Sequence, residues 1–283
     1  HAIDQTTSPK QTIHYVYADG LARQGKAIDD NVQQLSFKRD GYNDEVTGID
    51  HWNAWTPVNS NYNAVDSPVI QGYTPDELVV EKSTVNPTDK DIEVTVTYNA
   101  DKQAAKITYI DDTTGKTLTH DDFSGRTNEH EDYTPIDRIQ EFENKGYELV
   151  SNDYPDGGFN FDDNDQQDQV FNVHLKHGTT TVTPENPGKP GEPVDPDNPD
   201  GPKYPAGTEE FQVKRTGTQT IHYVGAGDKT PADNKQTFIF TREITFDNVT
   251  REIISKTPWN VKSHTFGNVD TPVIPGYHTD TAV

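Results

Sequence analysis

Apolar and polar residues alternate in several short stretches, which is the pattern of strands that bury one face. The four clearest stretches carry Ile13, Tyr15 and Tyr17; Val94, Val96 and Tyr98; Ile107 and Tyr109; and Phe171, Val173 and Leu175. Leu35 and Phe37 have the same period of two, which favours a strand over a helix in that segment. Most of the chain is therefore expected to form strands.

One segment has the signals of a helix. Thr134 is a candidate N-cap, Pro135 suits the first helical position, and Gly146 suits the left-handed residue after the last turn. The expected apolar face consists of Ile136, Ile139 and Phe142. A single helix among many strands predicts a β-rich α+β fold, with the helix packed across a small sheet.

Two parts of the chain repeat each other. The hexapeptide at residues 11–16 returns unchanged at 219–224, and residues 55–73 align without gaps on 259–277. A tandem array of domains displays the same surface repeatedly and rarely shares one active site. The repeats therefore argue against an enzyme.

Proline occurs at every third position in the segment that precedes the second repeat. These residues are Pro184, Pro187, Pro190, Pro193, Pro196, Pro199, Pro202 and Pro205. The spacing matches the three residues per turn of a polyproline II helix, so residues 181–206 are predicted to form an extended linker. A Pro-rich peptide ligand for another domain is the competing interpretation.

These boundaries give five segments: a leader, a first repeat domain, a different second domain, the linker and the start of a further repeat. They span residues 1–10, 11–100, 101–180, 181–206 and 207–283. The last segment has no counterpart of residues 93–98. Its opening strand is therefore expected to be frayed, completed by a neighbouring molecule or continued by further residues.

Composition narrows the class of protein. Lys and Arg number 24 and Asp and Glu 47, so the net charge is 24 − 47 = −23, and the mean hydropathy is −0.91. So acidic a surface disfavours nucleic acid and anionic membranes, and no apolar stretch is long enough to be inserted into a bilayer. The chain has no Cys and no Met, which excludes disulfides and thiolate chemistry and suits an extracellular location.

The repeated motifs resemble those of mucus-binding protein repeats from the surface adhesins of lactobacilli. Residues 11–16 and 67–73 resemble the family's first (B1-like) domain, and residues 107–111 with 145–150 resemble its mucin-binding (MucBP, B2-like) domain. The resemblance implies β-grasp (ubiquitin-like) domains in an elongated rod, on the outside of a cell and anchored to its wall. It also implies binding to mucin glycans and, for some repeats, to immunoglobulins.

Sugar binding needs an aromatic face beside polar groups that reach the sugar hydroxyls. Trp52, with Asn53, Asn59 and Asn61, has that composition and is the candidate glycan site. Trp55 recurs as Trp259 and is expected to lie in the core, whereas Trp52 recurs as Lys256 and is the aromatic expected to be exposed.

Acidic residues of the second domain are candidate ligands for Ca²⁺, which takes six to eight oxygens from flexible loops. They are Asp111, Asp112, Asp156, Asp162, Asp163 and Asp165. A solvated acidic loop is the alternative, because runs of charge usually face water. His14 and His222 occupy equivalent positions and are expected to be ordinary, partly exposed strand residues.

No hydrolase or phosphate-binding motif is present in the sequence. We therefore expect a monomeric segment of an adhesin that binds mucin glycans weakly and repeatedly. An immunoglobulin-binding module and a stalk without a ligand are the alternatives.

Overall fold

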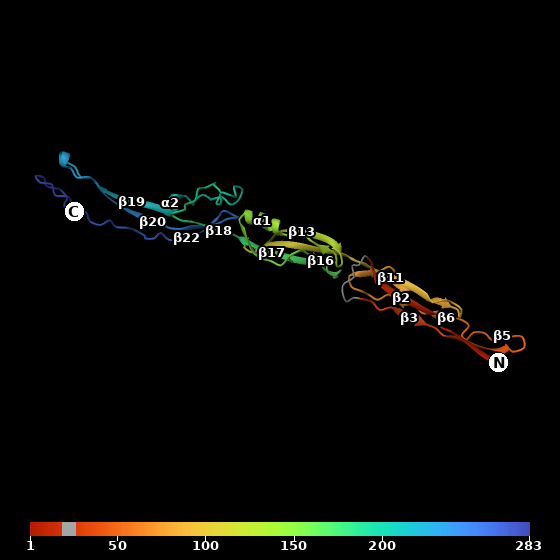
Figure 1. The fold of residues 1–283 in the computed structure, drawn as a ribbon. Helices are drawn as coiled ribbons and strands as arrows, with labels where there is room; N and C mark the ends of the chain where they lie inside the picture. The colour runs from red at the N-terminus through yellow and green to blue at the C-terminus, as the bar shows by residue number, and fades with distance from the viewer. Residues whose placement is uncertain (19–26) are drawn as a thin grey trace. The chain divides into compact units, whose positions relative to one another are not determined.

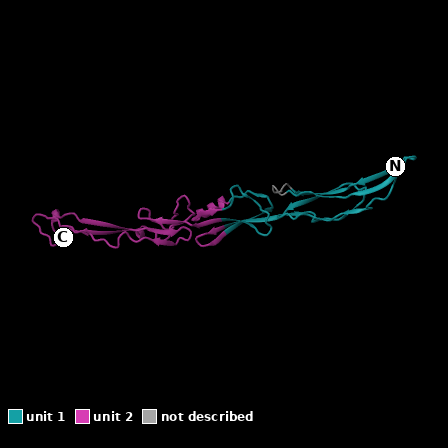
Figure 2. Ribbon diagram, turned by 90° about the horizontal axis from the view of Figure 1, so that it is seen from below, with its two compact units in different colours: residues 1–108, 119–134, 153–172 teal, residues 109–118, 135–152, 173–283 magenta. Residues whose placement is uncertain are grey.

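The structure, a computed structural model, describes residues 1–18 and 27–283. Strands dominate these residues, which confirms the β-rich fold; the helices described are α1 (Ile136–Asn144), α2 (Glu210–Val213) and the 3₁₀ turn η2 (Gly227–Lys229). The chain forms two compact units (Figure 2). Unit 1 comprises residues 1–108, 119–134 and 153–172, and unit 2 comprises 109–118, 135–152 and 173–283.

The first repeat is built on a four-stranded sheet in the order β3-β2-β11-β8. Its strands are β3 (Asn31–Gln34), β2 (Lys10–Tyr17), β11 (Ile92–Ala100) and β8 (Tyr73–Pro75). The central pair β2 and β11 is parallel, with Ile13 opposite Val94, and the two strands lie side by side in Figure 1. The alternation of residues that predicted both strands therefore builds the centre of this sheet.

The core of the first repeat lies on one face of this sheet. Its buried members are Ile13, Tyr15, Tyr73, Val80, Val96, Tyr98 and Ala100. The tyrosine rings meet edge to face, with 4.8 Å between the ring centroids of Tyr17 and Tyr73. Large aromatic side chains supply buried area that the low apolar content would otherwise not provide.

Residues assigned to a leader belong to a second sheet. β1 (Ala2–Thr7) pairs with β4 (Phe37–Asp44), and β4 pairs with β5 (Ile49–Trp52). Short pairs complete the repeat: β6 (Ser60–Tyr62) with β10 (Ser83–Val85), and β7 (Val65–Asp66) with β9 (Val79–Val80). The segment before residue 11 is thus folded into the repeat, because its alternating residues match the exposed and half-buried faces of β4.

The second domain has a sheet in the order β13-β12-β17-β15. Its strands are β13 (Lys116–Arg126), β12 (Lys102–Asp111), β17 (Gln169–His177) and β15 (Tyr147–Asn152), and β14 (His130–Glu131) pairs separately with β16 (Phe159–Asn160). The predicted strands at Ile107 and at Val173 are β12 and β17. Ile107, Tyr109, Val173 and Leu175 are all buried.

The helix α1 forms where the sequence predicted it, with three differences of detail. Pro135 is its N-cap, and no side chain, including that of Thr134, caps its first turn. Ile136 is exposed, whereas Ile139 is buried and Phe142 packs against Tyr109 and Tyr147. Gly146 follows with a φ of 104°, which is the left-handed conformation expected there.

The second copy of the repeat reproduces the pairing of the first. β19 (Lys214–Ile221) pairs with β20 (Asn234–Thr241), and Ile221 lies opposite Asn234 as Ile13 lies opposite Asn31. β18 (Thr179–Val182), β21 (Ile244–Asp247) and β22 (Ile253–Lys256) form a neighbouring sheet. Residues 261–283 contain no helix or strand.

The Pro-rich segment does not form the extended linker that was predicted. It folds back on itself: Gly188 N donates to Thr208 O, and Val194 N donates to Pro202 O. Val194 and Tyr204 pack against buried Phe246 and its neighbours. An extended helix would leave these two side chains in water, so burying them favours the folded arrangement.

Candidate functional site

The candidate aromatic Trp52 belongs to a stack of side chains on the β4–β5 hairpin. The guanidinium carbon of Arg39 lies 4.4 Å from the ring centroid of Trp52 and 4.6 Å from that of Trp55. Arg39 also donates from Nε to Gln5 Oε1 at 2.7 Å. Both tryptophans are half-buried, so Trp52 is less exposed than expected, because Arg39 covers part of it.

The three candidate asparagines have different environments. Asn53 is exposed, but its side chain donates to Asp40 Oδ2 at 3.2 Å. Asn61 is half-buried on β6 and accepts from Thr84 Oγ1 at 3.3 Å, while Asn59 is exposed. Asn53 and Asn59 can therefore offer polar groups to a ligand, and Asn61 is already engaged across its strand pair.

The opposite face of the same hairpin carries an aromatic pair that the sequence analysis missed. Tyr42 on β4 stacks on His51 on β5, with 4.8 Å between ring centroids and 19° between the ring planes. Tyr42 is 56% exposed. The pair could not be found from the sequence, because Tyr42 meets His51 only through the register in which β4 pairs with β5.

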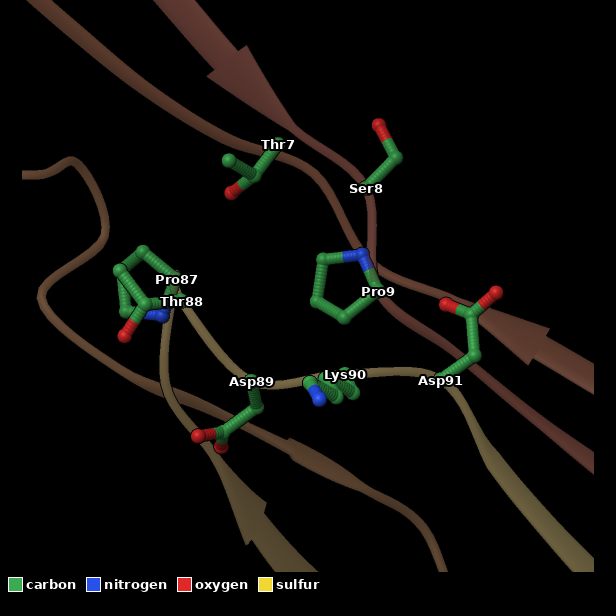
Figure 3. A pocket seen from close by; sticks show the side chains of 8 residues that line it. All are labelled: Thr7, Ser8, Pro9, Pro87, Thr88, Asp89, Lys90 and Asp91. Atoms are coloured by element: carbon green, nitrogen blue, oxygen red, sulfur yellow. The ribbon is translucent and has the colours of Figure 1, made fainter.

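A shallow depression lies between the β1–β2 turn and the loop before β11. Figure 3 shows the rings of Pro9 and Pro87 beside the carboxylates of Asp89 and Asp91. Asp91 Oδ1 accepts from Lys10 N at 3.0 Å, and Asp89 Oδ2 accepts from Asn86 N at 2.6 Å. Each carboxylate thus fixes a backbone turn, and the depression is too open to enclose a ligand.

The candidate calcium ligands are engaged in separate interactions. Asp111 is buried and receives hydrogen bonds from Thr113 N and Thr114 Oγ1, and Asp112 Oδ1 pairs with His174 Nδ1 at 2.6 Å. The other four lie in unit 1: Asp156 precedes β16, and the acidic loop between β16 and β17 carries Asp162, Asp163 and Asp165. Within residues 1–18 and 27–283, no three His, Cys, Asp or Glu side chains gather in a metal-binding arrangement.

Asp165 of this acidic loop has a structural contact. Its Oδ1 accepts from Gln103 Nε2 at 2.6 Å, and Gln103 also donates to buried Thr127 Oγ1 at 3.0 Å. Thr127 in turn donates to Gly72 O at 2.7 Å. The loop thereby ties the start of the second domain to the first repeat inside unit 1. Calcium binding by the loop remains a prediction, which thermal unfolding in calcium and in chelator would test.

The most buried charged cluster of unit 2 centres on His177, the last residue of β17. Its Nδ1 lies 2.6 Å from Asp247 Oδ2 and its Nε2 lies 2.9 Å from Asp111 Oδ2. The side chains of His177 and Asp111 are only 6% and 3% exposed. Since both ring nitrogens face carboxylates, the geometry favours the doubly protonated imidazolium.

Burial opposes charge on His177, but the hydrogen bonds and negative charges of Asp247 and Asp111 outweigh it and raise the pKa of His177. Burial would likewise raise the pKa of Asp111, but the hydrogen bonds from Thr114 and Thr113 and the charge of His177 lower it. For Asp247, burial is outweighed by the hydrogen bonds from Thr250 and His177, and the pKa falls. The cluster is thus an ion triplet that holds β12, β17 and β21 together.

His14 and His222 also pair with carboxylates, each in its own copy of the repeat. His14 Nδ1 lies 2.9 Å from Asp30, and His222 Nδ1 lies 2.7 Å from Asp233. Both pairs are substantially exposed to solvent. Each is a surface pair on the hairpin that the two copies share.

Comparison with known families explains the repeat. The family model described as "Muc B2-like domain" matches residues 1–102 and 208–283, and the model described as "Mucin binding domain" matches residues 103–177. The chain is a mucus-binding protein repeat. The Muc B2-like match falls on the two flanking copies, although the resemblance in sequence had suggested that name for the middle domain.

Solved structures include similar proteins. The type 2 repeat of the mucus-binding protein MUB from Lactobacillus reuteri is 31% identical, with 64% of this chain and 87% of that chain covered and a TM-score of 0.37. Mub-RV is also 31% identical, with 62% and 84% covered and a TM-score of 0.40. The mucin-binding domain of Spr1345 from Streptococcus pneumoniae is 29% identical over 35% of this chain and 96% of that chain, with a TM-score of 0.31.

No curated protein sequence matches this mucus-binding repeat. Its families are those of adhesin domains rather than enzymes, and mucus-binding adhesin domains are typically found on the outer surface of cells. Among the described residues, no helix is both long and apolar enough to cross a bilayer.

Proposed function

We propose that this chain is a segment of a wall-anchored, extracellular adhesin that binds mucin glycans through repeated, weak sites. The match of residues 103–177 to a mucin-binding domain carries this proposal, with the two flanking copies of a mucus-binding repeat beside it. Linked modules raise the effective concentration of each other's ligands, so weak sites suffice for retention in mucus.

We place one glycan contact on the β4–β5 hairpin of the first repeat. Trp52 is the last residue of β5, exposed Asn53 and Asn59 follow it in the chain, and Asn61 lies on β6. The stack with Arg39 holds the Trp52 ring in one orientation, which lowers the entropy lost when a sugar binds. The ring supplies apolar contact, and the amides of Asn53 and Asn59 supply hydrogen bonds.

The test is retention of the full chain on immobilised mucin, with and without periodate oxidation of the glycans. We expect periodate to abolish binding, and Trp52→Ala to weaken binding by roughly five- to tenfold, since one lost aromatic contact is worth about 1–1.5 kcal/mol. Tyr42→Ala, on the other face of the hairpin, is the matched control. Thermal unfolding of each variant separates lost binding from lost folding.

Two outcomes would contradict the proposal in different ways. Binding that survives periodate would point to a protein ligand, and a parallel pull-down with immunoglobulin would test that alternative. No binding to either ligand would leave the chain as a stalk. Equal loss in Trp52→Ala and Tyr42→Ala would move the glycan contact away from Trp52 without removing the function.

A further inference from the structure

The β4–β5 hairpin of the first copy and the β21–β22 hairpin of the second copy end in the same turn. In the Asp44 turn (residues 44–48), Asp44 Oδ1 accepts from Val46 N at 2.9 Å and Gly48 N donates to Asp44 O at 2.7 Å. In the Asp247 turn (residues 247–251), Asp247 Oδ1 accepts from Val249 N at 2.8 Å and Arg251 N donates to Asp247 O at 2.8 Å. The two turns are therefore structural equivalents.

The Asp247 turn is covered by the end of the mucin-binding domain. Asp247 binds His177, and the amide of the next residue, Asn248, donates to Gly178 O at 2.9 Å. Gly146 lies directly against Asn248: a side chain at Gly146 would begin 3.0 Å from the Asn248 backbone. This contact consists of an imidazole, a carbonyl and a glycine, and all three fit the exposed end of a hairpin.

The Asp44 turn has the same carboxylate and turn amides, but no domain packs against it among the described residues. Val46 is 94% exposed, whereas its counterpart Val249 is partly buried. Asp44 uses Oδ1 within the turn, as Asp247 does, which leaves Oδ2 directed away from the turn amides. Over residues 1–18 and 27–283, no cationic side chain contacts Asp44.

We propose that the Asp44 turn is a docking surface for the end of another mucin-binding domain of the kind formed by residues 103–178. The imidazole of that domain would pair with Asp44, and its terminal glycine carbonyl would accept from Glu45 N. This chain's own domain cannot serve, because its His177 is already bound to Asp247. The partner is therefore a separate copy of the domain.

The flanking residues fit this arrangement. His1 exchanges backbone hydrogen bonds with Asn43, as Thr180 pairs with Phe246, so His1 and Thr180 hold equivalent places. Thr180 Oγ1 donates to Asn248 Oδ1 at 2.6 Å in the occupied joint. At the Asp44 turn the corresponding residues are His1 and Glu45, and the N-terminal ammonium of His1 lies 3.9 Å from Glu45 Oε1.

The experiment extends the chain with a second mucin-binding domain. Residues 103–179 are duplicated ahead of His1, so that Thr179 precedes His1 as it precedes Thr180 in the occupied joint. We expect amide hydrogen exchange in the Asp44 turn to slow by at least tenfold relative to the unextended chain, with Glu45 most affected. Asp44→Asn, or His177→Gln in the added domain alone, should reverse this protection.

The controls keep the result interpretable. Asp50→Asn alters a carboxylate of the same hairpin that bonds Asn43, and it should leave the protection intact. Slow amide hydrogen exchange in the added copy of β12 shows that the added domain is folded. Equal exchange of the Asp44 turn in the extended and unextended chains, with the added domain folded, would overturn the proposal.

Discussion

The two copies of the repeat share a hairpin but differ in what covers it. In the first copy Ile13 is fully buried and Tyr73 is 5% exposed, whereas their counterparts Ile221 and Tyr277 are partly buried and 52% exposed. The parallel strand β11 pairs with β2 in the first copy, whereas in the second copy β20 is the one strand that pairs with β19 among the described residues. Local sequence is thus sufficient for the hairpin, but its apolar face is buried only when a strand distant in sequence joins it.

A second difference concerns the Pro-rich segment. Beside it, the second copy carries buried Ile244 and Phe246, and the first copy has Gly41 and Asn43 at the equivalent positions. In the first copy the single strand β1 pairs with β4. In the second copy β18 pairs with β21 before the Pro-rich segment, and β19 pairs with β20 after it. The face of the repeat is therefore apolar where the segment covers it and polar where no such segment exists.

The largest expected effect concerns the glycine before the repeated tyrosine. Gly72 has a φ of 79°, and a β-carbon there would lie 2.6 Å from that of Asp163; Gly276 has a φ of 86° and open space around it. Gly72→Ala should cost about 3 kcal/mol of unfolding free energy, from backbone strain plus overpacking, and Gly276→Ala about 1 kcal/mol. Urea unfolding of both variants measures the difference. Equal losses of unfolding free energy would show that the close approach of Gly72 to Asp163 does not require glycine.

The next effect is a pH dependence of the second copy and its junction with the mucin-binding domain. The pKa of His177 is raised above 6.5, so its stabilisation is complete below pH 6.5 and is lost as pH rises through the folded-state value. The pKa values of Asp111 and Asp247 are lowered below 3.8, so their stabilisation is present above that pH and is lost in stronger acid. Stability of this region should therefore decline below pH 3.8, where the two aspartates are protonated, and again as the pH rises through the raised pKa of His177.

Hydrogen exchange of the β17, β18 and β21 amides at pH 6 and pH 9, corrected for intrinsic rates, measures the alkaline decline. His177→Gln should remove most of it, because glutamine does not titrate. His174→Gln is the control, since His174 pairs with Asp112 at a more exposed position. The same decline in wild type and His177→Gln would show that another group is responsible.

The smallest effect concerns the cation–π contacts. The first copy places one arginine, Arg39, against two tryptophans, and the second places Arg215 and Arg242 against Trp259 alone. Arg39→Met should cost about 1 kcal/mol and Arg242→Met about half as much, because Arg215 still covers Trp259. Chemical denaturation followed by tryptophan fluorescence compares them, and a larger loss in Arg242→Met would contradict this explanation.

The sequence alone determined the features that depend on neighbouring residues. The period-two alternation located β2, β11, β12 and β17, and Gly146 marked the end of α1. The repeated hexapeptide and the turn motifs identified the family, because strands and turns are specified within a few residues.

Tertiary structure decided where distant segments meet. The period of three prolines suggested an extended linker, yet burying Val194 and Tyr204 on Phe246 folds the segment back. His177 meets Asp111 and Asp247 across 66 and 70 residues, and no spacing in the chain announces that cluster. Such contacts depend on the free energy of burying particular side chains together, which a one-dimensional pattern does not record.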